Sequence, residues 1–322
     1  MRKLLLSTTA LAAAATLSAN AALADVDVSG YYEWSYSSVG SDIAANDGTS
    51  FGQDSEIKIS FTNKTDSGLT VGMVSEFEVD KASNGVSDDN YMYISGGFGK
   101  LTLGELDGVT DQYGISASDL PAEEIYTGEP ADMITENADA GSAGGEANKV
   151  SYHIPAVGGL TGGISFMNSG VDGDADATEY ALSYAMDAGG AGVTIAAVTG
   201  TADVAGAQDA DHQVIGASIT SGAMTFNLSQ ATYEDADQNE ETNGAAAKFA
   251  LGNGMTIVGY TTKTEDDTSA EEYTVSGLEL QYSIASGLTA YVDIEDYDYK
   301  VGTSGNTADA GTASKLTIKA SF

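Results

Sequence analysis

Apolar and polar side chains alternate one by one along most of the chain after about residue 25. Over residues 69–80 nearly every second side chain is apolar, while Glu76, Glu78 and Asp80 lie on the opposite face. Residues 179–186 repeat the pattern, with tyrosine, leucine and methionine on one face. Alternation of period two is typical of a β-strand with one apolar face. The pattern therefore predicts an all-β chain, and no long stretch shows the period of a helix.

The segments between these strands alternate between short and long. The short turns are residues 63–68, 96–100, 155–159, 187–192, 221–222, 251–254 and 285–287. The long polar loops are residues 39–54, 81–89, 107–148, 169–177, 201–210, 234–242, 264–272 and 300–311. Seven turns interleaved with eight loops predict sixteen strands in up-and-down order. Within residues 273–284 the apolar face switches across Gly277, which predicts a glycine-centred bulge.

Short turns at one end and long loops at the other are typical of a transmembrane barrel. Inside a bilayer every backbone group must be paired, so a sheet there closes on itself, with its apolar face toward lipid. A barrel of about sixteen strands is too wide for its side chains to fill, and a water-filled channel remains. The expected fold is therefore a sixteen-stranded antiparallel up-and-down transmembrane β-barrel. The alternative is an exported β-sandwich or β-helix with a dry core.

The first residues predict export. Arg2 and Lys3 precede an apolar run over residues 4–17, and Ala22 and Ala24 supply small residues before a cleavage site. This is the layout of a signal peptide, and the run is too short for a membrane-spanning helix. We expect a signal peptide at residues 1–24 and one barrel domain at residues 25–322.

The predicted mature chain is strongly acidic. It keeps 10 lysines and no arginine against 48 aspartates and glutamates, a formal excess of 38 negative charges. Such a chain repels nucleic acid, and its natural counter-ions are cations. The chain has no cysteine, which excludes a disulfide scaffold and a thiol nucleophile.

Four parts of the chain carry a family resemblance: residues 26–32 (VDVSGYY), 96–104 (GGFGKLTLG), 148–155 (NKVSYHIP) and the last residue, Phe322. Together they resemble the general diffusion porins of alphaproteobacteria, of the Rhodobacter type. Residues 26–32 are similar to the first strand of that family, and residues 96–104 to its turn and fifth strand. Residues 148–155 (NKVSYHIP) are similar to the strand that follows its third loop. The final strand ends on Phe322, which resembles the signal that the barrel assembly machinery reads. The resemblance covers essentially all of residues 25–322.

The resemblance implies a homotrimer of sixteen-stranded barrels in which the third loop, residues 107–148, folds inward and narrows the channel. The composition of this loop fits that role, because it carries ten carboxylates and no basic residue. The candidate constriction residues are Asp107, Asp111, Asp119, Glu123, Glu124, Glu129, Asp132 and Glu136, and Asp139 and Glu146 follow in the same loop. The alternative is that these carboxylates form a solvated surface run.

The chain departs from the family pattern on the opposite wall. Relatives place arginines there, one of them after the glycine of the fifth strand, where this chain has Glu105. The remaining candidates for a positive wall are Lys58, Lys315 and Lys319, which by alternation point away from lipid and which we expect close together. We therefore expect a channel for ions and small hydrophilic solutes that prefers cations.

Other functions fit the sequence less well. His153 is expected on the lumen wall and His212 at the rim, and no catalytic triad surrounds either one, so we expect no enzyme. An acidic exported surface or adhesion protein without a pore is the second hypothesis. Paired acids recur, and oxygen ligands suit Ca²⁺ or Mg²⁺, which would bridge loops or neighbouring lipopolysaccharide. No cofactor is required.

Overall fold

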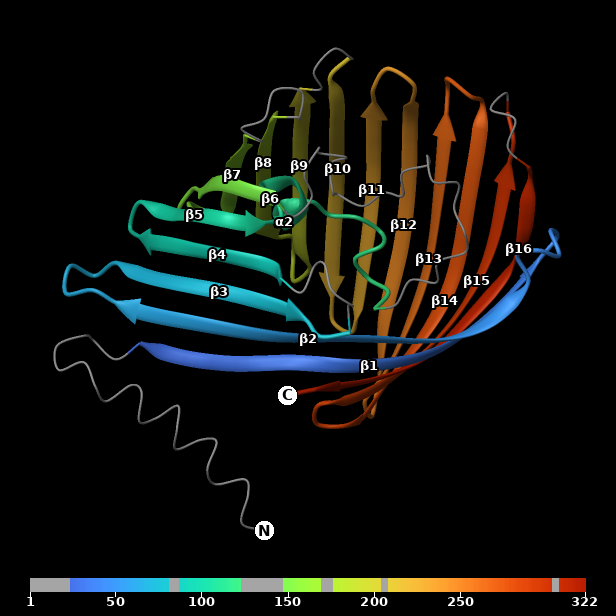
Figure 1. Ribbon diagram of the computed structural model, residues 1–322, viewed down its shortest axis with the longest axis horizontal. Coiled ribbons are helices and arrows are strands. Elements are labelled where there is room, and N and C mark those ends of the chain that lie inside the picture. Colours follow the sequence, from blue (N-terminus) through green and yellow to red (C-terminus); the bar gives the residue numbers. More distant parts are fainter. Residues whose placement is uncertain (1–23, 81–86, 123–146, 169–175, 204–207, 303–306) are drawn as a thin grey trace, which may run out of the picture.

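The computed structural model describes residues 24–80, 87–122, 147–168, 176–203, 208–302 and 307–322. Sixteen antiparallel strands form one closed barrel, in which each strand pairs with its neighbours in sequence and β1 pairs with β16 (Figure 1). The strands of the first half are β1 Asp25–Ser41, β2 Gly48–Lys64, β3 Thr70–Glu78, β4 Ser87–Gly96, β5 Gly99–Leu106, β6 Ala147–His153, β7 Leu160–Met167 and β8 Asp176–Asp187. Those of the second half are β9 Gly192–Asp203, β10 Ala210–Ser221, β11 Met224–Glu234, β12 Asn239–Gly252, β13 Met255–Asp266, β14 Glu271–Ala285, β15 Leu288–Lys300 and β16 Asp309–Ser321. The predicted fold class is confirmed, while the predicted signal peptide lies almost wholly outside the described residues.

The barrel closes between its first and last strands. Tyr31 lies opposite Ser321 and Ser41 opposite Gly311, so β1 and β16 pair over eleven positions of the register. Phe322 and Gly30 exchange two further backbone hydrogen bonds, with N···O distances of 3.0 and 3.1 Å. A closed sheet leaves no strand edge unpaired, which a bilayer requires.

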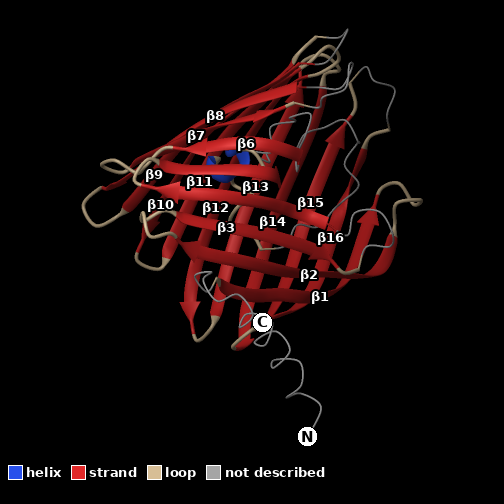
Figure 2. Ribbon diagram, turned by 60° about the vertical axis from the view of Figure 1, so that its left-hand side comes forward, coloured by secondary structure: helices blue, strands red, loops and turns tan. Residues whose placement is uncertain are grey.

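The two faces of the barrel differ as the alternation predicts. Outward-facing Leu182 and Ile215 are 54% and 60% exposed, whereas inward-facing Thr102 and Thr317 are fully buried. Among the described residues, no helix has the length and the apolar composition of a membrane-spanning segment. The helix α2 (Val109–Tyr113) is short and lies inside the ring of strands (Figures 1 and 2).

For three of the long loops the predicted length is wrong. The connections at residues 42–47, 235–238 and 267–270 are much shorter than expected, because the flanking strands continue beyond the apolar band. The polar sequences of these segments indicate loops, but the structure extends the strands into them. Gly48 pairs with Val39, and Glu240 pairs with both Tyr233 and Asp266. Strand pairing continues there with polar side chains on both faces.

The predicted bulge at Gly277 is also wrong. Gly277 lies in regular register between Tyr260 and Glu295. A Cβ at this position would overlap the ring of Tyr260, which passes over the glycine and donates hydrogen bonds to Glu295 and Asp293. The apolar face switches because Tyr273 packs inward in a cluster with Tyr297 and Tyr299, whereas Leu278 faces outward.

Candidate functional site

The third loop is attached to the inner wall from its first residues. Helix α2 packs against β7, β8 and β9. The Val109 amide donates to Ser165 Oγ at 3.1 Å, and Ser165 Oγ donates in turn to the carboxylate of Glu179. Val109, Ser165 and Glu179 are each at most 2% exposed. A buried hydrogen-bonded chain therefore fixes where the loop leaves the wall.

The middle of the loop is held by β10 and β11. The backbone of Ile115 lies so close to Gly216 that a Cβ there would overlap the Ile115 carbonyl oxygen. Asn227 Nδ2 donates to the Ser116 carbonyl at 2.7 Å, and the Ala117 amide donates to Ser229 Oγ at 3.1 Å.

The end of the described loop is held by β12, β13 and β14. Leu120 packs with Ala246, Val258 and Tyr260, and the Ala122 amide lies 3.0 Å from both carboxylate oxygens of Glu279. Residues 107–122 thus follow the inner wall strand by strand from β7 to β14. This path agrees with the predicted inward folding of the third loop. Within the described part of the chain, this segment leaves the inner wall of β1–β4 uncovered.

Three of the predicted constriction carboxylates belong to the described loop. Asp107 is half-buried, Asp111 is exposed, and Asp119 Oδ2 accepts a hydrogen bond of 2.8 Å from the Ser116 amide. Burial raises the pKa of Asp119, and the Ser116 hydrogen bond opposes this rise. Glu123, Glu124, Glu129, Asp132 and Glu136 lie outside the described residues, so their role stays a prediction.

The uncovered wall of β1–β4 is also acidic. Carboxylate oxygens gather there in two groups of three within 4.8 Å of one another: Asp54, Glu78 and Asp80, and Glu56, Glu76 and Asp88. Asp89 on β4 is close enough to Asp107 of the loop for their charges to interact. Carboxylates therefore face each other from the loop and from the wall, and either wall group offers the oxygen ligands that Ca²⁺ or Mg²⁺ prefers.

Comparison with known proteins identifies the chain. A family model described as Gram-negative porin matches residues 7–302. The chain belongs to the Gram-negative porin family. It is an outer-membrane protein that forms a channel for the diffusion of solutes, and the hypothesis of a surface protein without a pore is not supported.

Solved porins share the fold of this porin at low sequence identity. The anion-selective porin from Comamonas acidovorans superposes with a TM-score of 0.70 at 16% identity, over 93% of this chain and all of the other. The trimer form of OmpT from Vibrio cholerae gives 0.70 at 13% identity, over 93% and 99% of the two chains. A mutant of the Rh. blastica porin gives 0.66 at 15% identity, over 92% of this chain and all of the other. No curated protein matches the sequence.

Each lysine proposed for the porin's positive wall lies beside a different carboxylate. Lys58 on β2 forms an ion pair with Glu76, and Lys319 Nζ on β16 lies 3.2 Å from Glu33. Lys319 Nζ also lies 4.0 Å from the ring centroid of Tyr31. Lys315 lies directly opposite Asp293 in the register of β15 and β16. The wall that these lysines occupy is therefore not a free positive surface.

Three further lysines face the lumen and were not predicted. Lys100 lies over the rings of Tyr91 and Tyr93, and Lys149 and Lys248 donate to the carbonyls of Leu106 and Leu120. The sequence pattern could have indicated the lumen position of Lys149, because Lys149 is adjacent to Val150 and therefore lies on the opposite, lumen-facing side of the strand. Glu105, where relatives carry arginine, faces outward: it pairs with Asn90 and Asn148, on the same side as Leu103.

The histidines also belong to the inner wall of the porin. His153 faces the lumen as expected, with Nδ1 3.0 Å from the hydroxyl of Tyr113. His212 lies near the start of β10, as expected for a rim residue, but it is buried, with only 2% of it exposed. It lies on the inner face of β10, two residues before Val214, which packs against Val109 of the loop.

Proposed function

We propose that this porin is a cation-preferring channel for passive diffusion of ions and small hydrophilic solutes, and that it works as a homotrimer. One observation carries the cation preference: carboxylates lie both on the described loop and on the wall it leaves uncovered, while Lys58 on that wall and Lys319 on the adjacent β16 are each ion-paired. Two unit charges about 10 Å apart interact by roughly 1.7 kcal/mol at an effective dielectric of about 20. Several such interactions of one sign favour cations in a water-filled channel between low-dielectric walls.

The proposal includes the partners and the processing of the chain. Trimeric assembly is supported by OmpT, which is trimeric in one solved form. The leader is removed after Ala24, so the mature chain begins at Asp25, which N-terminal sequencing tests. Phe322, 71% exposed at the end of the chain, is the recognition signal for the barrel assembly machinery. Deleting Phe322 should leave the protein unassembled, and normal assembly would contradict this role.

Paired charge variants test the selectivity. Glu56→Gln with Glu78→Gln removes two charges from the uncovered wall and should lower the ratio of potassium to chloride permeability about twofold or more. Glu241→Gln with Glu265→Gln removes two charges from the outer face near the mouth and is the matched control. The measurement is the zero-current potential of purified protein in a planar bilayer under a KCl gradient. An equal response of the two variants would refute the wall as the determinant.

The same recordings test divalent binding. We propose that Ca²⁺ or Mg²⁺ binds the wall carboxylates, because their oxygens lie close enough to share one hard cation. Millimolar Ca²⁺ should lower the potassium preference of the unmodified porin more than that of the wall variant. A calcium effect of the same size in both would contradict the site.

A further inference from the structure

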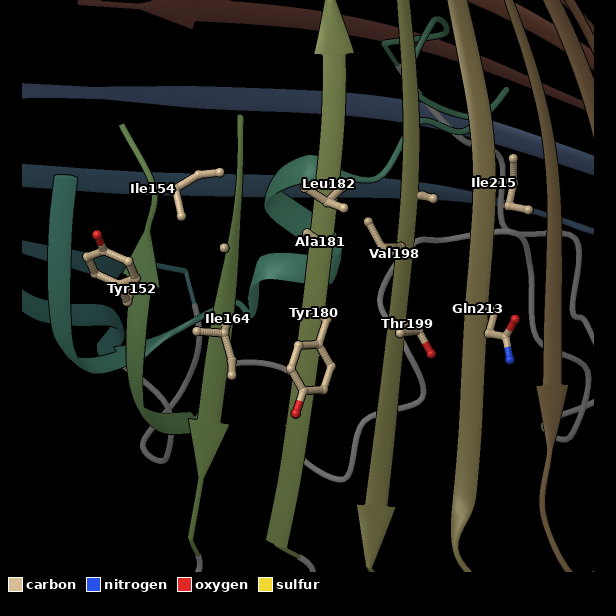
Figure 3. Close-up of a pocket in the computed structure, with 12 residues that line it drawn as sticks. Tyr152, Ile154, Ile164, Tyr180, Ala181, Leu182, Val198, Thr199, Gln213 and Ile215 are labelled. Atoms are coloured by element: carbon tan, nitrogen blue, oxygen red, sulfur yellow. The ribbon is translucent and has the colours of Figure 1, made fainter. Parts of the chain in front are cut away.

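The outer surface of the barrel is hollowed between β6 and β10. The groove has a volume of about 580 Å³, within the range of ligand sites in proteins. Its floor is low because Ala197 on β9 lies between two large neighbours in direct register, Leu182 on β8 and Ile215 on β10. Toward β6 the groove continues past Ile164 to Tyr152 and Ile154 (Figure 3).

One end of the groove is polar. Tyr180, Thr199 and Gln213 form a cross-strand row, and Figure 3 shows them together on one side of Leu182 and Ile215. β8 ends at Asp187 in a short turn, so this row lies toward the opposite end, where the long loops are. Since short turns face the periplasm, the polar end points to the outer leaflet.

Thr199 and Gln213 have no side-chain hydrogen bond to the described residues. One row nearer the loops, Thr201 Oγ1 donates to Asp211 at 2.7 Å, so those outward groups satisfy each other. A second outer groove lies between β10 and β14. Its polar group is paired within the protein, because Thr261 Oγ1 donates to the Val275 carbonyl at 3.0 Å. Exposed polar groups at the edge of the hydrocarbon region are costly without a partner, and at this position Thr199 and Gln213 are open to polar groups of a lipid.

We propose that the groove binds one lipopolysaccharide molecule, with an acyl chain along Leu182, Ala197 and Ile215. The ester, amide or hydroxyl groups at the head of that chain bond to Thr199 and Gln213. The groove suits an acyl chain because a chain lying on its recessed floor contacts protein atoms on several sides. These contacts give more dispersion attraction than a flat surface of bulky side chains would. Lipopolysaccharide, the lipid of the outer leaflet, is chosen over phospholipid because the polar end faces that leaflet. The site rests on the outer-membrane location and is independent of ion selectivity.

The test compares lipid retention by the purified oligomer in detergent. Lipopolysaccharide or phosphatidylethanolamine is added at equal concentration, and the bound lipid is counted by native mass spectrometry. Ala197→Phe fills the floor and should lower lipopolysaccharide affinity about tenfold. The matched control is Ala290→Phe, at an outward-facing alanine on β15 paired with Tyr282 and Ile318, and it should retain lipid as the unmodified porin does.

Gln213→Leu keeps the groove and removes its polar end, so it should also weaken binding if Ala197→Phe fails to assemble. Channel conductance shows that each variant is folded, and it should not change. Equal retention of phosphatidylethanolamine, or equal retention by Ala197→Phe and Ala290→Phe, would overturn the proposal. A change of oligomeric state in Ala197→Phe at unchanged lipid would identify the groove as a protein contact instead, which would overturn it as well.

Discussion

Gly216 determines how closely the third loop approaches the wall. Its missing side chain leaves room for the backbone of Ile115, which a Cβ would overlap. Gly216→Ala should therefore push the loop toward the channel axis and lower single-channel conductance, at a cost of about 1–3 kcal/mol in stability. Gly259→Ala is the control, since a Cβ there meets only Leu278 Cδ1 at 4.0 Å. Equal conductance of the two variants would contradict the close approach.

Ser165 connects the loop to the buried carboxylate of Glu179. Ser165→Ala removes the acceptor of the Val109 amide, and a buried donor left unpaired costs about 1–3 kcal/mol. The loop should then detach more often, which bilayer recordings report as increased open-channel noise. Ser218→Ala, on the inner face of β10 away from these contacts, should leave the noise unchanged. Quiet channels from Ser165→Ala would exclude this anchoring role.

At the residue scale, alternation assigned faces well and contacts poorly. It placed Lys58, Lys319 and His153 on the lumen side, where the register puts them. It did not reveal that Glu279 would accept from Ala122, 157 positions away in the chain. Such a contact depends on the path of the loop across several strands, which no local pattern encodes.

At the scale of elements, the strands were predictable where one of their faces meets lipid. The apolar band of β14 carries Leu278, Leu280 and Tyr282 on one side, which local alternation indicates. Beyond that band both faces are polar, as where Lys263 and Lys300 bond to Glu272 on the outer surface. The alternation disappears there, although the backbone pairing continues. For this reason the sequence pattern predicts loops at the ends of these strands.

The third loop shows the same limit for an irregular element. Its length and its ten carboxylates pointed to the channel, but the composition of residues 107–122 did not indicate attachment along eight strands. The attachment uses backbone groups and small polar side chains, such as Ser229 and Asn227, which are common in any strand.

At the scale of the whole molecule, closure of the barrel predicts resistance to unfolding. Every strand has two paired neighbours, so no edge is available from which to separate the sheet. The purified porin should run as a compact oligomer in electrophoresis without boiling and shift to the monomer position after boiling. Light scattering in detergent should give the mass of a trimer. A band that never shifts, together with a monomeric mass, would contradict the proposed assembly.

The net charge of the lumen determines which ions pass. The described loop and the uncovered wall are both acidic, and added salt screens such charges, with a Debye length of about 10 Å at 0.1 M. Cation preference should therefore be strongest in dilute solution and should weaken as salt rises.

The zero-current potential of the unmodified porin under a KCl gradient measures directly which ion the channel prefers. We expect a potential whose sign shows that potassium passes more readily than chloride, with a magnitude that falls as both salt concentrations are raised together. A potential of the opposite sign, or one that vanishes at low salt, would show that acidic groups do not control the passage.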